Sequence, residues 1–250
     1  MKYFDYNGLI YDLNNEMYTA TIIKSDQALK IVNIPRSIIY ESQEYVITTI
    51  CQYSFAFHKN IQVVTFSDDS KVELIENEAF TNSSLLSISI PPSVTKIGKR
   101  SFYSCEELFM VKFTEDSKLK IIDSEAFLCC GFKSFFLPSN VIEIGENSFN
   151  SCSNLLLFSI PENSKLTTIK KKAFAWTPII SLYFPQNLQN LGEEWSCSMT
   201  CLRAIKISPY NKIFKSICDD NSMIVGKSDP NSDLYDSLVF VTRQIKFLKI

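Results

Sequence analysis

The chain contains a single histidine, His58, and this scarcity restricts the enzyme classes that the sequence can support. A Ser/His/Asp or Cys/His nucleophilic site would have to use this one residue as its base. No Gly-x-Ser-x-Gly motif accompanies it, and the six glycines are not clustered as in a phosphate-binding loop. We therefore expect no catalytic residues and no cofactor, and we interpret His58 as structural.

Strong net charge and long apolar runs are also missing. The formal charge is −2, so the sequence has no broad positive surface for nucleic acid or for an anionic membrane. No apolar run reaches the roughly 18 residues that a membrane-spanning helix requires. Residues 1–13 contain no apolar core of a secretory signal. We expect no nucleic-acid partner and no membrane span.

A short unit recurs along most of the chain. Its aliphatic anchors are separated by alternating steps of 25 and 22 residues: Ile50, Ile75, Ile97, Ile122, Ile144, Ile169 and Leu191. The combined offset of 47 residues also relates two further sets: Gly98, Gly145 and Gly192, and Pro91, Pro138 and Pro185. Self-similarity at a fixed short period is typical of a repeat solenoid, in which each unit packs only against its neighbours.

Each unit predicts the same local structure. It ends in a pattern such as Leu108-x-x-Val111-x-Phe113, which indicates a short strand that stacks in parallel on the next, about 4.8 Å away. The preceding segment, such as 101–105, is too short for a helix, and we expect one helical or 3₁₀ turn on the outer face. The resulting fold is predominantly β. A phenylalanine column should fill its interior, until Trp195-Ser196 takes that place: Phe55, Phe80, Phe102, Phe127, Phe149 and Phe174.

The two ends of the chain depart from the repeat. We divide it into an N-terminal cap with a hairpin and a first strand (1–45), seven repeats (46–207) and a hairpin-containing segment (208–250). Turn-forming pairs support the hairpins: Asn14-Asn15 lies between two apolar runs, and 219–221 lies between 213–217 and 223–225. Residues 245–250 resemble 29–34, so we expect the chain to stop in mid-repeat with an open strand edge.

Residues 85–105 read Leu-x-x-Ile-x-Ile-Pro-x-x-Val-x-x-Ile-Gly-x-x-x-Phe-x-x-Cys, and this pattern resembles the BspA-like class of leucine-rich repeat. Residues 31–207 fit it. The resemblance implies a leucine-rich-repeat solenoid and a binding role, because many members from bacteria and parasitic protists are surface proteins that adhere to host or matrix proteins. It also implies a cell-surface or secreted location, although no signal is visible; otherwise the location is cytoplasmic. It supplies no catalytic residues.

Three cysteines form a column of their own. Cys105, Cys130 and Cys152 follow the phenylalanines by three residues in successive units, and His58 occupies the same column. Stacked coils would bring neighbouring Cα atoms to about 5 Å, within the range of a disulfide. A ladder of small buried residues, disulfides and a metal site are all compatible with this spacing. The sequence does not decide between reduced and disulfide-bonded cysteines, and we expect no metal.

The outward positions of the predicted strands are less polar than an exposed sheet face should be. The flanking units carry polar residues there, but the middle units carry eight apolar ones: Leu86, Phe109, Met110, Phe136, Leu156, Leu157, Ile180 and Tyr183. An apolar centre with a polar rim is typical of a protein-interaction site, so these eight are the candidate partner-binding residues. A register shifted by one residue is the alternative, and it would bury Leu86, Phe109 and Leu156.

These features predict a non-enzymatic protein-binding repeat protein, adhesin-like or surface-antigen-like, that holds a host or matrix protein on its exposed sheet face. The alternative is a structural module that stacks end to end with another chain, or with the rest of a longer protein, through the open edge at Ile250. Self-association that raises the molecular mass with concentration would favour the alternative.

The phenylalanine column generates a first prediction. Phe127→Ala should lower the free energy of unfolding by about 3–5 kcal/mol, because it empties a large buried site. Urea titration followed by circular dichroism measures this loss. A loss below about 1 kcal/mol would place Phe127 outside the core and break the repeat alignment.

Overall fold

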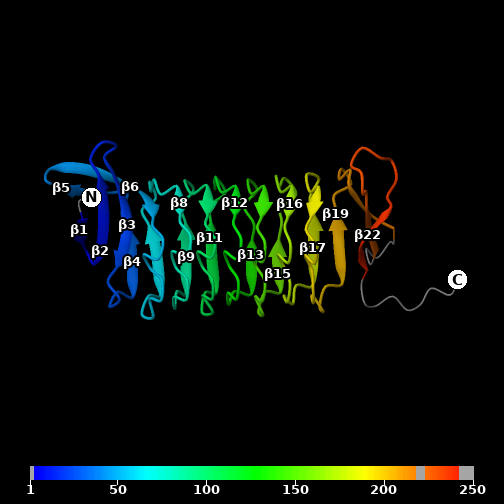
Figure 1. The fold of residues 1–250 in the computed structure, drawn as a ribbon, viewed down its shortest axis with the longest axis horizontal. Helices are drawn as coiled ribbons and strands as arrows, with labels where there is room; N and C mark the ends of the chain where they lie inside the picture. Colours follow the sequence, from blue (N-terminus) through cyan, green and yellow to red (C-terminus); the bar gives the residue numbers. More distant parts are fainter. Residues whose placement is uncertain (1–2, 218–222, 242–250) are drawn as a thin grey trace.

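Along this chain, short apolar segments alternate with turns, and the backbone folds into a stack of coils. The computed structural model describes residues 3–217 and 223–241, and the coils lie side by side along one long axis (Figure 1). Each repeat coil contributes two short strands, which run parallel to those of its neighbours. The expected solenoid of short parallel strands is confirmed.

The first series of strands, the long-strand sheet, corresponds to the strands expected at the end of each unit. Its backbone pairing joins β4–β7–β9–β11, β13–β15 and β17–β19, which follow one another along the solenoid (Figure 1). The strands are β4 (Ile31–Ile34), β7 (Val63–Phe66), β9 (Ser87–Ile90), β11 (Met110–Phe113), β13 (Ser134–Phe136), β15 (Leu157–Ser159), β17 (Ser181–Phe184) and β19 (Ala204–Ile207).

The second series, the short-strand sheet, was not expected. It starts from β6 (Gln43–Ile50) and continues through β8 (Leu74–Ile75), β10 (Lys96–Ile97), β12 (Ile121–Ile122), β14 (Glu143–Ile144), β16 (Thr168–Ile169) and β18 (Asn190–Leu191). Its register pairs the aliphatic anchors of the repeat, from Ile50 to Leu191. Sequence analysis identified the anchors but not their strands, because two residues are too few to show an alternating pattern.

The outer segment of each coil is not helical, so the expected helical or 3₁₀ turn is wrong. The described residues form no helix, and therefore none that could span a membrane. The N–H groups of Arg100, Phe102 and Ser104 donate to carbonyls of the next coil at 3.0, 2.8 and 2.8 Å, while those between them donate three residues back. Arg100 and Ser104 have left-handed backbone, with φ of 55° and 52°. A helix would direct every N–H along its own axis, so hydrogen bonding between coils selects this pair of turns.

The phenylalanine column fills the interior as expected. All of its members, from Phe55 to Phe174, are fully buried. Successive rings stack with centroids 4.8 to 5.6 Å apart and planes within 18° of parallel. The next coil departs from this pattern: the N–H of Phe174 donates to the carbonyl of Trp195, which places Trp195 one position before the column. Its buried ring instead packs edge-on against Phe184, 5.7 Å away.

Antiparallel sheets lie at the two ends of the stacked coils (Figure 1). At the N-terminal end, β1 (Tyr3–Tyr6), β2 (Leu9–Asn14) and β3 (Thr19–Ser25) form hairpins, β3 pairs in parallel with β6, and β5 (Ser37–Tyr40) pairs with β6. At the other end, β20 (Phe214–Ser216), β21 (Met223–Gly226) and β22 (Ser237–Val241) form a three-stranded sheet. The turn expected at 219–221 and the strand expected at 245–250 lie outside the described residues.

The repeat glycines mark close approaches between coils. A Cβ atom on Gly145 would lie 2.5 Å from the carbonyl carbon of Asp123 in the preceding coil. Gly98 and Gly192 face the preceding coil in the same way, at 2.7 and 2.5 Å from a carbonyl carbon. All three glycines follow the 22-residue step. The shorter step therefore brings two backbones to a distance that leaves no room for a side chain.

Gly145→Ala should consequently lower the free energy of unfolding by about 1–3 kcal/mol, because an added methyl group forces the two coils apart. Urea titration measures the change. Glu146→Ala, at the exposed neighbouring position, is the control and should cost less than about 0.5 kcal/mol. Equal stability of Gly145→Ala and wild type would show that the coils do not meet there.

Candidate protein-binding face

The outward side chains of the long-strand sheet form three columns that run along the solenoid. We call them the long-strand face, and they include the residue that precedes each strand. The first column is Gln62, Leu86, Phe109, Lys133, Leu156, Ile180 and Arg203; the second is Val63, Ser87, Met110, Ser134, Leu157, Ser181 and Ala204; the third is Thr65, Ser89, Lys112, Phe136, Ser159, Tyr183 and Lys206. The residues between the second and third columns, from Val64 to Ile205, are buried.

The structure leaves most of the candidate binding residues exposed to solvent. Five are among the exposed large apolar side chains: Phe109 (55%), Phe136 (59%), Leu156 (48%), Leu157 (47%) and Ile180 (45%). Leu86, Met110 and Tyr183 are half-buried. The register therefore agrees with the expected outward orientation. The shifted register, which would have buried Leu86, Phe109 and Leu156, is not the one in the structure.

Pairing between coils places these residues side by side. The N–H of Phe109 donates to the carbonyl of Leu86 at 3.0 Å, and that of Ile180 donates to Leu156 at 3.4 Å. Lys133 accepts from the N–H of Leu156 at 3.0 Å, so its side chain shares the first column with these apolar neighbours. Successive residues of one column lie one strand spacing apart, about 4.8 Å, so a single partner can contact several of them.

The short-strand sheet presents a different surface, on which charges are paired. Lys96 lies 2.7 Å from Asp123 of the next coil, and Lys170 lies 2.8 Å from Glu143 of the preceding one. These pairs join strands of successive coils, as cross-strand charge pairs do. Because several of its charges are paired within the molecule, this surface is a weaker candidate for a binding site than the long-strand face.

His58 is held by the backbone on both sides of its ring. Nδ1 accepts from the N–H of Ile61 at 3.1 Å, so the ring proton is on Nε2, which donates to the carbonyl of Asp26 at 2.8 Å. The side chain is fully buried. Both ring nitrogens therefore form hydrogen bonds to backbone groups where the N-terminal sheet meets the first repeat coil. This agrees with a structural role for His58.

The cysteine column is a ladder of free thiols. Cys105, Cys130 and Cys152 are buried, and each thiol donates to the carbonyl of a phenylalanine in the preceding coil, at 3.1, 3.1 and 3.0 Å. Burial raises the pKa of the Cys105 thiol to about 11 and raises the pKa of the other two. Thiolate, the form that binds metal and attacks electrophiles, is therefore disfavoured. In the part of the chain that is described, no cluster of three or more His, Cys, Asp or Glu side chains could hold a metal ion.

Two exposed aromatic residues escaped the sequence analysis because they lie on outer turns. Phe57 and Trp176 are 59% and 63% exposed, and both have left-handed backbone. Their turn position is occupied by serine in other coils, including Ser104 and Ser151. The sequence did hold a signal for them: an aromatic residue stands at a turn position where other coils carry a small polar residue.

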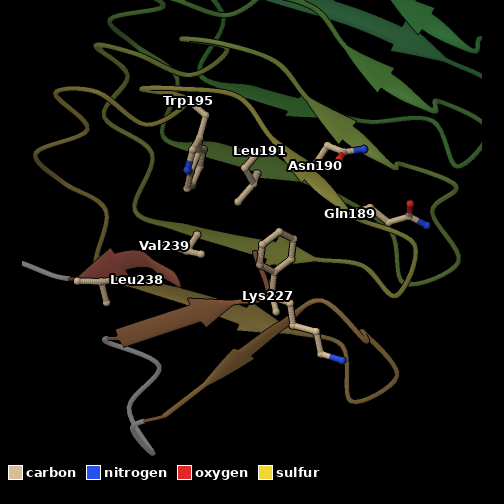
Figure 2. Close-up of a pocket in the computed structure, with 8 residues that line it drawn as sticks. Gln189, Asn190, Leu191, Trp195, Lys227, Leu238 and Val239 are labelled. Atoms are coloured by element: carbon tan, nitrogen blue, oxygen red, sulfur yellow. The ribbon is translucent and has the colours of Figure 1, made fainter. Parts of the chain in front are cut away.

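A cavity of about 350 Å³ lies where the last repeat coil meets the C-terminal sheet (Figure 2). Leu191 and Trp195 line it from the coil, and Lys227, Leu238 and Val239 line it from the other side. It coincides with the place where the phenylalanine column has ended, Trp195 packs one position before it, and parallel stacking gives way to an antiparallel sheet. We attribute the cavity to this change of packing and assign no ligand to it.

Comparison with known proteins relates the whole arrangement to one family. The family model described as BspA type leucine rich repeat region matches residues 36–155 and 120–224, in six copies. A solved structure of a leucine rich cell surface protein from Faecalibacterium prausnitzii is 25% identical, with a TM-score of 0.75, over 91% of this chain and 59% of that one. No curated protein matches the chain.

Two further solved structures share the fold. A leucine-rich repeat protein from Bacteroides ovatus is 26% identical with a TM-score of 0.72, and the match covers 83% of this chain and 54% of that one. The pneumococcal vaccine antigen PcpA is 22% identical with a TM-score of 0.66, and the match covers 90% of this chain and 54% of that one. The chain thus spans between about half and three fifths of these three structures.

Thiol reactivity tests the cysteine ladder. At pH 8, iodoacetamide should modify exposed Cys201 in the native protein while Cys105, Cys130 and Cys152 stay unmodified, because their raised pKa and burial suppress the thiolate. Peptide mass spectrometry identifies the modified sites, and unfolding in urea should expose all of them. Modification of the column at the rate of Cys201 would contradict its burial, and cysteines that stay unmodified in urea until a reductant is added would reveal disulfides.

Proposed function

The chain belongs to the BspA-type leucine-rich repeat family, and on this premise we propose that it is a non-enzymatic protein-binding repeat protein whose binding surface is the long-strand face. An adhesin-like or surface-antigen role at the cell surface is the form of this function that we favour. It is supported by the relative from F. prausnitzii, which is described as a cell surface protein.

The observation that carries the proposal is the group of exposed apolar side chains in the middle of the long-strand face. Large exposed apolar groups that are clustered and rimmed by polar residues mark interaction sites. The fold does not require them there, because the same columns carry Gln62 and Thr65 in the first repeat coil. Burying a phenylalanine or leucine side chain in an interface would gain about 1.5–3 kcal/mol. A partner protein supplies that burial.

Two further features support binding over catalysis. Leucine-rich repeat families and folds are generally non-enzymatic, and their repeated surfaces serve as extended binding sites. The single histidine of the chain is buried with both ring nitrogens bonded to backbone groups. A base for nucleophilic catalysis would need one of those nitrogens free.

Retention of a protein partner tests the proposal. Immobilised wild type should retain a protein from host-cell or extracellular-matrix extract, and Phe109→Ser/Phe136→Ser should retain at least about tenfold less, because central aromatic residues dominate interface energies. Phe57→Ser/Trp176→Ser is a matched control, since it also removes two exposed aromatics but installs the serine that other coils carry. Circular dichroism confirms that both variants are folded.

Each result separates the candidate functions. If Phe109→Ser/Phe136→Ser loses the retained protein and Phe57→Ser/Trp176→Ser keeps it, the long-strand face is supported as the binding site. Equal retention by wild type and both variants shows that the face is not the site. Where nothing is retained and sedimentation shows mass rising with concentration, end-to-end assembly becomes the better explanation.

A further inference from the structure

The long-strand face carries charge of only one sign. Its charged residues are Lys112, Lys133, Arg203 and Lys206, and none of its positions holds an aspartate or glutamate. The whole chain has more acidic than basic residues, 27 against 25, so this surface departs from the composition of the protein. The acidic residues nearest in sequence, such as Glu106 and Glu115, lie in the turns outside the face.

These cations have no acidic partner among the residues that the structure describes. Lys112, Lys133, Arg203 and Lys206 are exposed, and none of them makes an ion pair with another described residue. Elsewhere some lysines and arginines do find carboxylates in the neighbouring coil, as Lys96 does with Asp123 and Arg100 with Glu125, while others, such as Lys120, make no ion pair with a described residue. Coils of the same spacing could have paired the cations of the long-strand face in the same way.

Each cation lies next to an exposed or half-buried apolar residue. Lys206 is directly opposite Tyr183 in the register of β17 and β19, and the N–H of Arg203 donates to the carbonyl of Ile180. Lys133 is bonded to Leu156 through its carbonyl. The aliphatic stems of lysine and arginine extend an apolar surface, while their charged ends stay in water. The face thus offers apolar contact and positive charge at the same places.

Resting on the proposed function, we propose that the long-strand face recognises an acidic protein segment that carries apolar side chains between its carboxylates. Carboxylates would complement the unpaired cations, and the apolar side chains would cover Phe109, Phe136 and Leu156. A polyanion such as nucleic acid or a sulfated glycan would pair the cations but leave the aliphatic residues Leu156, Leu157 and Ile180 without partners.

The dimensions of the face suit a short extended segment. From β9 to β19 there are five strand spacings, or about 24 Å. An extended chain advances about 3.3 Å per residue, so roughly seven or eight residues span this distance across the strands. Successive residues of such a segment point to opposite sides of its backbone. A segment lying edge-on to the sheet would therefore direct its apolar side chains along one side of its backbone and its carboxylates along the other, with both kinds within reach of the face.

Synthetic peptides test this inference directly. The probe is a fluorescein-labelled peptide of about eight residues with alternating leucine and glutamate, and its partner probe has glutamine for every glutamate. Fluorescence anisotropy gives the Kd for each peptide, at about 50 and 300 mM salt, since pairing between exposed charges weakens as salt rises. An oligothymidylate of similar length and a heparin oligosaccharide serve as polyanions without apolar side chains.

Two variants with four substitutions each test whether the cations of the long-strand face bind the peptide. The face variant replaces four cations by glutamine: Lys112→Gln, Lys133→Gln, Arg203→Gln and Lys206→Gln. The control variant makes the same change of net charge at exposed lysines elsewhere: Lys71→Gln, Lys99→Gln, Lys118→Gln and Lys120→Gln. We expect the glutamate peptide to bind wild type and the control variant alike, and to bind the face variant about 30-fold more weakly.

Every other outcome is decisive as well. If the glutamine peptide binds as tightly as the glutamate peptide, and the face variant binds both like wild type, recognition is apolar only; this inference fails while the proposed function stands. Tighter binding of oligothymidylate or heparin than of the glutamate peptide would assign the cations to a polyanion. If no peptide binds, the inference is overturned, and the extract experiment with Phe109→Ser/Phe136→Ser still decides the proposed function.

Discussion

Hydrogen bonds between neighbouring coils are the constraint on which the rest of this structure depends. The short strands, the outer turns and the long strands all donate backbone N–H groups to an adjacent coil. Such bonding holds successive strands about 4.8 Å apart. Aromatic rings stack at nearly the same distance, so one phenylalanine per coil fills the interior at 4.8 to 5.6 Å between centroids. The column ends at Phe174, one coil before Trp195 and close to where the antiparallel sheet begins.

The same spacing turns every outward position into a column, and the two sheets use their columns differently. On the short-strand sheet, residues of opposite charge in neighbouring coils form ion pairs, as Lys96 does with Asp123 and Lys170 with Glu143. On the long-strand face, large apolar residues and unpaired cations occupy them instead. Because the backbone geometry is common to both sheets, the difference lies in the side chains, and side chains that the fold leaves unsatisfied are available to a partner.

Features that recur at the same position of every coil could be predicted from the sequence, whereas features that depend on contact between coils could not. Phe127 and Ile122 could be assigned to the interior because equivalent residues recur at fixed offsets, whatever the local conformation. The exposure of Phe136 followed from the alternation of strand side chains, and that of Phe109 from its place between the inward Leu108 and Val111 of the repeat pattern. The turn at Arg100 and Ser104, by contrast, depends on carbonyls that lie 24 residues away in sequence. No local pattern contains that information, and helical and turn segments of this length have similar composition.

The position of the apolar residues also bears on how a partner can approach. Contact through an end of the solenoid would involve the terminal coils, and the N-terminal end is already covered by β1 to β3. The terminal parts also carry exposed apolar side chains, such as Ile39 and Leu238, but those of the long-strand face lie together between β9 and β17, along the side. Serines such as Ser87, Ser134 and Ser159 are interspersed among them, so small side chains stand beside groups of large ones. A surface of alternating large and small residues lets side chains of a partner pack between its own, which flat contact between two ends would not use.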